Sequence, residues 1–331
     1  MTGATASQSD PGHEPELLTT CQVAEFVDKG FLQFDSVVPQ TINDAAIKTF
    51  SEHGMVDMLR AKPDSGTPLA DCYPDPSPIG AMLRLPRVAG IITSLVGPNP
   101  RFDHDWMHVR LPGDLVDQHL HQDAIVDTTL AFDIQIFWFF HAIEAGAGGT
   151  GFVPGSHLRR VNEMDIARYQ NIVGQRDVVC PAGSIIVFHQ GMWHRGRANR
   201  SEAERRAYKI RINPTRPQVR HWDLSDFDEV HGEVHDHLFA NYRTDTAAGM
   251  FRNHEPWHEV AAGRLETVQR SKLWRYMTGD GSFDSDWYLT RTEQRAPLAG
   301  ESVGPAGESV AAGSGGVTGS GEGTGSRGAG A

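Results

Sequence analysis

The sequence predicts a mainly β protein, an antiparallel sandwich or barrel, with helices before and after it in the chain. Residues 101–214 contain short β-rich runs separated by Gly and Pro, which is typical of such folds. Helical periodicity precedes this stretch and returns after Pro217. With 331 residues, 39% hydrophobic and 22% charged, the chain has the composition of an ordinary globular protein with one or two cores.

The part before residue 101 is expected to be helical with one short strand. Helices are predicted at about residues 17–30, 42–53 and 88–95, and a strand at 31–34. Thr19 or Thr20 can cap the first helix, and Gly30 can end it, because Ser or Thr is favoured at a helix start and Gly just after its end. Gly54 and Gly97 are expected to end the other two helices.

The β-rich part is expected to contain six strands and one helical excursion. The predicted strands cover residues 105–111, 117–121, 129–142, 177–180, 184–189 and 205–213. The excursion covers residues 157–170, and further helices are expected near 224–241 and 258–274.

The expected organisation is one domain between two loose ends. Residues 1–16 are polar, and residues 297–331 are rich in Gly and Ser without any aromatic residue, so neither end has much apolar surface to bury. Residues 17–296 then form a single domain, divided into a helical part (17–100), a β core (101–217) and a helical extension (218–296).

Charge and cysteine content exclude several classes of function. The formal charge of −12, from 30 basic and 42 acidic residues, argues against nucleic acid and anionic lipid as partners and favours a small-molecule substrate. Three scattered cysteines without C-x-x-C spacing argue against a disulfide framework and a thiolate zinc site, so a cytoplasmic protein is expected. No apolar stretch is long enough for a membrane span, and the oligomeric state is left open.

Three residues with metal-binding side chains form the most informative pattern. His121 and Asp123 are two residues apart, so an extended backbone points both side chains to one side. His194 follows the apolar run at 185–188 and can be brought alongside from a distant strand. Two histidines and one carboxylate on one face of an octahedral ion are the arrangement of non-haem Fe(II) oxygenases, and the remaining positions accept a 2-oxo acid and O2.

An arginine is the expected partner for the far carboxylate of such an acid. Arg205 follows His194 by eleven residues, and a guanidinium binds a carboxylate through two parallel hydrogen bonds. Arg206 is the alternative. If the apolar set Tyr208, Ile210 and Ile212 packs outward under the N-terminal helices, Arg205 faces the cavity; in the opposite orientation Arg206 does.

Five separate stretches, in order, make the sequence similar to the phytanoyl-CoA dioxygenase family of Fe(II)/2-oxoglutarate oxygenases. Residues 26–31 resemble the family's F-x-x-x-G-F, residues 110–113 its K-P-P-G with Arg and Leu replacing Lys and the first Pro, and residues 121–123 its H-x-D. Residues 148–157 resemble the loop ending in P-G-S-H. Residues 183–205 resemble the G-D-x-x-x-F-H stretch with its later His, Asn, Ser and Arg, although Ser184 stands where Asp is usual.

The resemblance implies a double-stranded β-helix of the jelly-roll, cupin-like type, with Fe(II) held by His121, Asp123 and His194 and 2-oxoglutarate anchored by Arg205. It also implies hydroxylation of an unactivated C–H bond of a small molecule, such as a secondary metabolite in a biosynthesis, with release of succinate and CO2. Many relatives have Ser or Thr two residues after the distal His, where this chain has Gly196. His108 and Arg110 are candidates for the missing contact.

Two other classes of function use the same pattern. A cupin-like metal-dependent isomerase or lyase, or a dioxygenase independent of 2-oxoglutarate, would need the three metal ligands but not Arg205. A non-catalytic module of this fold would have a damaged ligand set or no anchor, and neither defect is found in the sequence.

Overall fold

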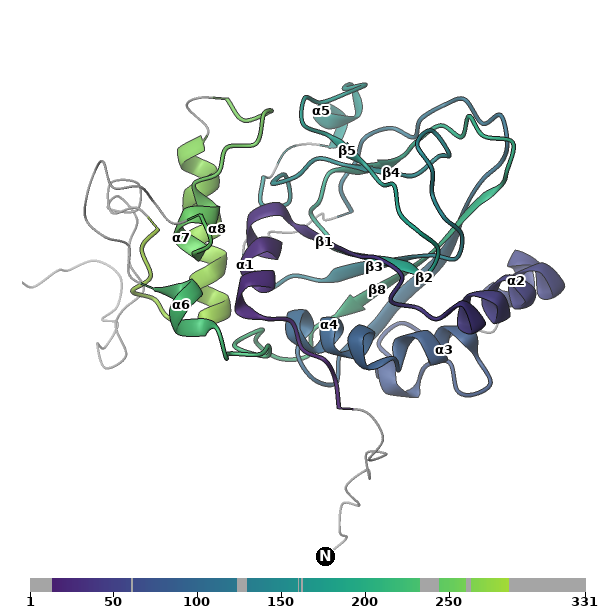
Figure 1. The fold of residues 1–331 in the computed structure, drawn as a ribbon, viewed down its shortest axis with the longest axis horizontal. Helices are drawn as coiled ribbons and strands as arrows, with labels where there is room; N and C mark the ends of the chain where they lie inside the picture. Colours follow the sequence, from purple (N-terminus) through teal and green to yellow (C-terminus); the bar gives the residue numbers. More distant parts are fainter. Residues whose placement is uncertain are drawn as a thin grey trace, which may run out of the picture. The chain divides into compact units, whose positions relative to one another are not determined.

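Two antiparallel β-sheets flanked by helices form the fold (Figure 1), which confirms the predicted fold class at that level. The computed structural model describes residues 14–60, 62–123, 130–159, 161, 163–232, 244–259 and 263–285, all within the unit Met1–Arg295. The expectations for residues 1–13 and 286–331, including the loose tail, fall outside the described residues.

The strands pair into one sheet of five and one of three. The larger sheet has the order β1-β6-β3-β8-β2 and the smaller one β5-β4-β7, and every pairing is antiparallel. The strands are β1 (Phe31–Phe34), β2 (Arg101–Arg110), β3 (Ile134–Phe139), β4 (Thr150–Phe152), β5 (Arg176–Asp177), β6 (Ser184–His189), β7 (His194–Gly196) and β8 (Arg205–Asn213).

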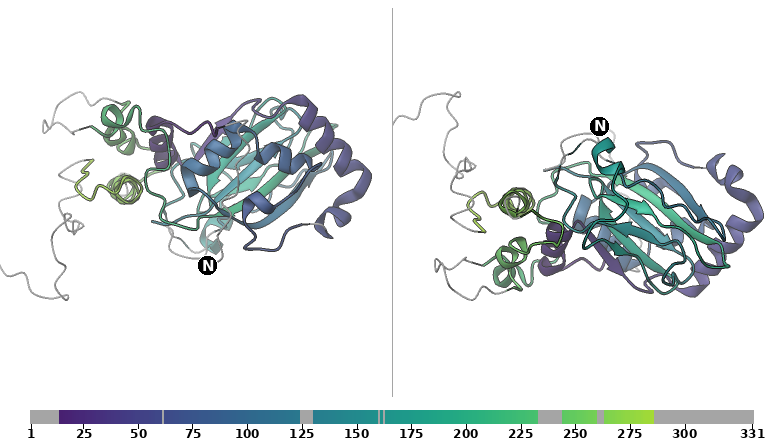
Figure 2. Two further views of the ribbon diagram at one scale, coloured as in Figure 1. Left: turned by 90° about the horizontal axis from the view of Figure 1, so that it is seen from below. Right: turned by 90° about the horizontal axis from the view of Figure 1, so that it is seen from above.

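Helices cover one face and one end of the larger sheet. The helices of the structure are α1 (Thr20–Lys29), α2 (Gln40–Arg60), a 3-10 turn η1 (Leu69–Asp71), α3 (Pro78–Leu83), α4 (Pro86–Val96), α5 (Glu163–Ala167), which lies beside the smaller sheet, α6 (Phe227–His231), α7 (Ala247–Phe251) and α8 (Gly263–Thr278). In Figures 1 and 2, α3 and α4 lie across the sheet, and α6, α7 and α8 gather beside α1. None of the described helices is both long and apolar enough to span a membrane.

The first helix shows how local sequence sets the boundaries. Thr19 accepts a hydrogen bond from the backbone N–H of Gln22, and the Gln22 side chain accepts one from the Thr19 N–H, which completes a capping box. Gly30 ends α1 with φ of +82°, and a Cβ there would lie 2.5 Å from Nδ1 of His157. Glycine is therefore required at position 30 for both conformation and space, and the chain can enter β1 directly.

Alternation along the strands builds two separate cores. Ile136, Ile185 and Ile210 belong to the outward set, which packs against α1 and α4. Phe137, Phe188 and Ala207 belong to the inward set, which packs between the two sheets. Because β3 is buried on both faces, its six residues Ile134–Phe139 are all buried. The cavity described below opens along the inward face.

Several elements differ from the prediction. Residues 117–121 form no strand beyond a single bridge between His121 and His194, because side chains take part of the backbone ladder. The side chains of Asp117 and Gln118 accept from the N–H groups of Ala198 and Gly196, and the Gln118 N–H donates to the Gly196 carbonyl. Helix α2 continues through Gly54 to Arg60, since one glycine inside a helix costs only about 1 kcal/mol.

Other differences concern length. The excursion at 157–170 is helical only in α5, and the helix expected at 224–241 is α6, with residues 233–243 outside the described part. The helix expected at 258–274 is α8, which begins at Gly263. Helices α3 and α7 and strands β4 and β7 were not predicted, because segments of three to six residues are too short for a clear period.

A buried glutamine, Gln218, connects the end of helix α4 to the segment that leads into strand β3. The side-chain amide of Gln218 donates to the carbonyls of Leu95 and Phe132 at 2.8 and 3.0 Å, and its oxygen accepts from the Phe132 N–H at 3.1 Å. Because Gln218→Leu leaves these backbone groups buried without partners, we expect it to lower the free energy of unfolding by about 2–4 kcal/mol in denaturant titrations. The exposed control Gln40→Leu should change it by less than about 0.5 kcal/mol; equal effects would contradict this role.

Candidate metal centre

His121, Asp123 and His194 meet at one point of the structure. One ligand atom from each lies within 4.8 Å of the others, and this is the single such group of His, Cys, Asp and Glu found in the described residues. The two histidines are backbone partners: the N–H of His121 donates to the His194 carbonyl at 3.1 Å, and the reverse bond is 2.8 Å. The Asp123 N–H donates to the Gln190 carbonyl at 3.2 Å, which turns the carboxylate toward both rings.

Backbone carbonyls determine which nitrogen of each imidazole is available. Nδ1 of His121 lies 2.9 Å from the His119 carbonyl oxygen, and Nδ1 of His194 lies 2.9 Å from that of Met192. Since a carbonyl only accepts, each Nδ1 carries the proton and each Nε2 carries a lone pair. These Nε2 atoms lie 3.7 and 3.9 Å from the two Asp123 carboxylate oxygens. The cluster thus presents two nitrogen lone pairs and one carboxylate to the same space.

The carboxylate of Asp123 is kept ionised. Burial by itself would raise its pKa, but the neighbouring His194 and Lys209 and the Gln135 hydrogen bond outweigh burial and hold the pKa of Asp123 below its usual range. Nε2 of the buried Gln135 donates to Oδ2 of Asp123 at 2.7 Å, and Nζ of Lys209 lies 3.7 Å from the same oxygen. Oδ1 is left for another partner.

His194 is neutral at neutral pH. Burial, and then the neighbouring His121, lower the pKa of His194 to about 4. The ring packs against Phe188, with centroids 5.2 Å apart. Its lone pair therefore stays available over the whole range in which the protein is expected to work, and acidification through about pH 4 protonates it.

The cluster lies in a cavity of about 430 Å³ that follows the β2–β8 pair. The strand register orders its wall: Arg110 is opposite Arg205, His108 is opposite Ala207, and Trp106 is opposite Lys209. The guanidinium groups of Arg110 and Arg205 therefore lie at one end of the cavity wall. The ammonium group of Lys209 and the indole of Trp106 lie further along the wall, and His108 lies between these two pairs.

The orientation of β8 places Arg205 inside the cavity and Arg206 outside. Tyr208, Ile210 and Ile212 pack outward with the helices, which is the arrangement under which the sequence favours Arg205. Arg205 is 4% exposed, and its Nε donates to the Gly148 carbonyl at 2.6 Å. Burial, and then the neighbouring Arg110, lower its pKa to about 10, so it remains charged. Arg206 forms an ion pair with Glu204 instead.

Arg110 occupies the space that a side chain at position 196 would need. Its Nη1 forms a 2.7 Å ion pair with Asp114, and its Nη2 donates to the Gly196 carbonyl at 3.2 Å. A Cβ on Gly196 would lie 2.7 Å from this Nη2.

His108 also lines the cavity. Burial, and then the neighbouring Lys209 and Arg205, lower the pKa of His108 to about 3, so this imidazole is neutral. Its Nε2 has no hydrogen-bond partner among the described residues.

Sequence analysis missed Thr150 and Gln135, which contribute to the same site. Thr150 lies on β4 directly opposite Gly196, lines the cavity, and is 1% exposed. Its hydroxyl oxygen has no hydrogen-bond partner among the described residues. The pairing of β4 with β7 reveals the position of Thr150, and no motif in the sequence announces that pairing. Gln135 is a polar residue in the otherwise apolar strand β3, and this contrast is the sequence signal that could have marked it as a site residue.

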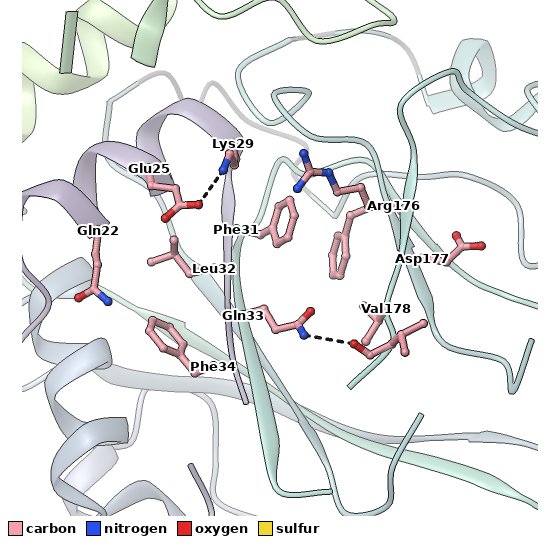
Figure 3. Close-up of a pocket in the computed structure, with 12 residues that line it drawn as sticks. Gln22, Glu25, Lys29, Phe31, Leu32, Gln33, Phe34, Arg176, Asp177 and Val178 are labelled. Atoms are coloured by element: carbon pink, nitrogen blue, oxygen red, sulfur yellow. Dashed lines mark hydrogen bonds and ion pairs between the residues drawn. The ribbon is translucent and has the colours of Figure 1, made fainter. Parts of the chain in front are cut away.

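Two other hollows lack a cluster of this kind. One, of about 410 Å³, lies between β1 and β5 (Figure 3) and contains the 2.7 Å ion pair of Glu25 and Lys29 and a hydrogen bond from Gln33 to the Val179 carbonyl. The other, of about 650 Å³, lies on the opposite side of β7 from His121, Asp123 and His194. Its Arg197 forms an ion pair with Asp117 at 2.7 Å. His119 lines this second hollow rather than the cavity of His121.

Comparison with known proteins gives one family and several similar folds. Residues 38–207 match the family described as phytanoyl-CoA dioxygenase (PhyH), which is about half of the chain. No curated protein matches the sequence. Similar solved structures include SnoK, a non-haem alpha-ketoglutarate-dependent carbocyclase from nogalamycin biosynthesis, at 19% identity over 60% of this chain and 87% of that one, with a TM-score of 0.46.

Two further structures have comparable similarity. HygX from Streptomyces hygroscopicus, with nickel and 2-oxoglutarate bound, is 16% identical over 60% of this chain and 88% of its own, with a TM-score of 0.47. The nickel complex of the non-haem monooxygenase ThoJ is 18% identical over 59% of this chain and 80% of its own, with a TM-score of 0.43.

Proposed function

Because this chain belongs to the phytanoyl-CoA dioxygenase family of Fe(II)- and 2-oxoglutarate-dependent oxygenases, we propose that it hydroxylates an unactivated C–H bond of a small molecule. The chain is a non-haem oxygenase that uses Fe(II), 2-oxoglutarate and O2. The products of the proposed reaction are a hydroxylated metabolite, succinate and CO2. The observation that carries the proposal is the convergence of two Nε2 lone pairs and one carboxylate in the cavity.

We assign the metal ligands to His121, Asp123 and His194. Two imidazole nitrogens and one carboxylate oxygen suit Fe(II), and three ligands leave positions open for other molecules. When bound, Fe(II) supplies the centre at which O2 reacts and 2-oxoglutarate is oxidatively decarboxylated. The chain's own contribution is to fix the tautomer of each histidine through the carbonyls of His119 and Met192, and the orientation of Asp123 through Gln135.

We assign the far carboxylate of 2-oxoglutarate to Arg205, supported by Arg110 and Thr150. Arg205 is buried and charged and has no carboxylate partner among the described residues, so it favours binding of an anion. Arg110, which fills the space beside Gly196, adds a second guanidinium, although Asp114 balances its charge. The unpartnered hydroxyl of Thr150 replaces the Ser or Thr that the family usually has at position 196. His108 borders the same space as a neutral imidazole.

The role of Thr150 can be tested with a near-isosteric variant. We expect Thr150→Val to raise the KM for 2-oxoglutarate by about tenfold or more, because one hydrogen bond to a charged group contributes about 1.5–3 kcal/mol. The affinity for Fe(II), measured by equilibrium titration, should stay unchanged. Thr215→Val removes a hydroxyl that donates to the Asn99 carbonyl at the surface, and serves as the control. An unchanged KM in Thr150→Val would contradict the assignment.

The proposed function is tested directly by product formation. The purified protein with Fe(II), ascorbate and 2-oxoglutarate should form succinate slowly without a substrate, and faster when a mixture of small metabolites contains the true one. A metabolite that gains one oxygen atom in the same incubation identifies the reaction as hydroxylation. Binding of Fe(II) without any binding of 2-oxoglutarate would reject the proposal.

A further inference from the structure

Lys209 is a charged cavity residue to which the assignments above give no task. Strand β8 alternates, so Lys209 faces the same cavity as Arg205, four residues away. Its side chain is only 12% exposed. Holding an ammonium group in such a place is costly unless an anion lies close to it. The chain as a whole is acidic, at −12, so this cation is not part of a generally basic surface.

Two other cations along the same face already have anionic partners, and Arg205 is assigned to 2-oxoglutarate. Arg211, the next inward residue of β8, donates to Asp133 at 2.7 and 3.1 Å and lies 3.2 Å from Asp103. Arg110 is balanced by Asp114 at 2.7 Å. Among the described residues Lys209 has one ion-pair partner, Asp123 at 3.7 Å.

That one partner is shared with the proposed metal. Asp123 already accepts the 2.7 Å hydrogen bond from Gln135, and as a metal ligand it gives its charge to the cation. Among the described residues, Lys209 is then left without an ion-pair partner of its own in the cavity. An anionic group on the molecule that enters the cavity would supply that balance.

Trp106 indicates what lies next to this anionic group. It is the register partner of Lys209 on β2, lines the same cavity, and is 43% exposed, although a tryptophan normally buries most of its ring. A flat apolar surface therefore lies beside the ammonium group at the open part of the cavity wall.

We propose that the substrate to be oxidised is a carboxylic acid, whose carboxylate binds Lys209 and whose flat apolar part lies against Trp106. The inference rests on the proposed function and specifies its substrate class. Because Lys209 is 3.7 Å from a proposed metal ligand, the oxidised carbon lies close to the carboxylate along the substrate. This carboxylate is separate from 2-oxoglutarate, whose far end is assigned to Arg205 at the other end of the register.

Matched acids and amides test this inference without turnover. The full chain, loaded with Ni(II) and saturating 2-oxoglutarate, is titrated calorimetrically with 2-naphthoate, indole-3-acetate and cinnamate, and with the carboxamide of each. We expect at least one acid to bind about tenfold more tightly than its amide, the ratio typical of one charge-assisted hydrogen bond. Lys209→Met and Lys209→Gln should abolish that preference, and Lys209→Arg should retain part of it.

Two further variants serve as references. Arg206→Met removes a cation from the outward face of the same strand and should leave the preference intact. Trp106→Ala should weaken the binding of acid and amide alike. The affinity for 2-oxoglutarate should be unchanged in all Lys209 variants, which also verifies that their folded cavity persists.

Four results would overturn the inference. Acids that bind no better than amides throughout the series, or a preference that survives in both Lys209→Met and Lys209→Gln, would show that Lys209 does not select the substrate. A loss of 2-oxoglutarate affinity in these variants would assign Lys209 to the co-substrate and leave the proposed function standing. Failure of the unaltered protein to bind Ni(II) and 2-oxoglutarate would instead reject the proposed function, and this inference with it.

Discussion

Replacing His194 by alanine is expected to abolish succinate formation and to lower the affinity for Fe(II) by at least about 100-fold. The variant removes one of three ligands and leaves two, which hold a divalent ion poorly. Because His194 is 5% exposed, His121→Ala, at a more accessible position, is measured in parallel and should give the same result. Metal affinity is measured by anaerobic equilibrium titration, and thermal unfolding verifies that both variants are folded.

His119→Ala is the matched control for these two variants. His119 is exposed and faces the neighbouring hollow, and the hydrogen bond that His121 makes to residue 119 uses the backbone carbonyl, which the substitution leaves in place. Its metal affinity and succinate formation should therefore equal those of the unaltered protein. If His194→Ala and His121→Ala retained Fe(II) binding, the metal would be held elsewhere in the chain.

Replacing Arg205 by methionine is expected to raise the KM for 2-oxoglutarate by about 100-fold, which corresponds to about 2.7 kcal/mol. The reason is the loss of a buried guanidinium that can form two parallel, charge-assisted hydrogen bonds with a carboxylate. The affinity for Fe(II) should stay within about threefold of that of the unaltered protein, because Arg205 is not assigned to the metal.

The neighbouring arginine provides the control for this second prediction. Arg206→Met removes the same charge one residue later, from the outward face of β8, and should change the KM by less than about threefold. Equal effects of the two substitutions would indicate a general charge effect. Full activity in Arg205→Met would favour a metal-dependent isomerase, a lyase or a dioxygenase independent of 2-oxoglutarate.

Elements with strong local signals could be predicted from the sequence alone. The first helix has a capping box and a terminal Gly30, and strands Phe31–Phe34, Ser184–His189 and Arg205–Asn213 match the predicted bounds. Elements that depend on distant partners could not be predicted from the sequence alone. The three residues of β4 pair with β5 and β7, and their own sequence does not distinguish a strand from a turn.

The residues of the candidate site fall into the same two groups, those that the sequence alone predicts and those that depend on distant partners. The H-x-D spacing and His194 depend on residue type and order, so the sequence alone proposes all three ligands. The orientation of β8 depends on which face the helices cover, and the packing of Ile210 and Ile212 decides it. Thr150 gains significance only from its register partner Gly196, which no spacing in the sequence reveals. Alternation along β8 places Lys209 on the face of Arg205, but its neighbour Trp106 follows only from the register of β2.

A crystal structure of the protein grown anaerobically with Fe(II) and 2-oxoglutarate tests the central proposal most directly. Anomalous scattering at the iron edge should place one metal ion between Nε2 of His121, Nε2 of His194 and the Asp123 carboxylate. The far carboxylate of 2-oxoglutarate should lie within hydrogen-bond distance of Arg205 and Thr150. An iron ion bound away from these three side chains, or 2-oxoglutarate absent from the cavity at saturating concentration, would contradict it.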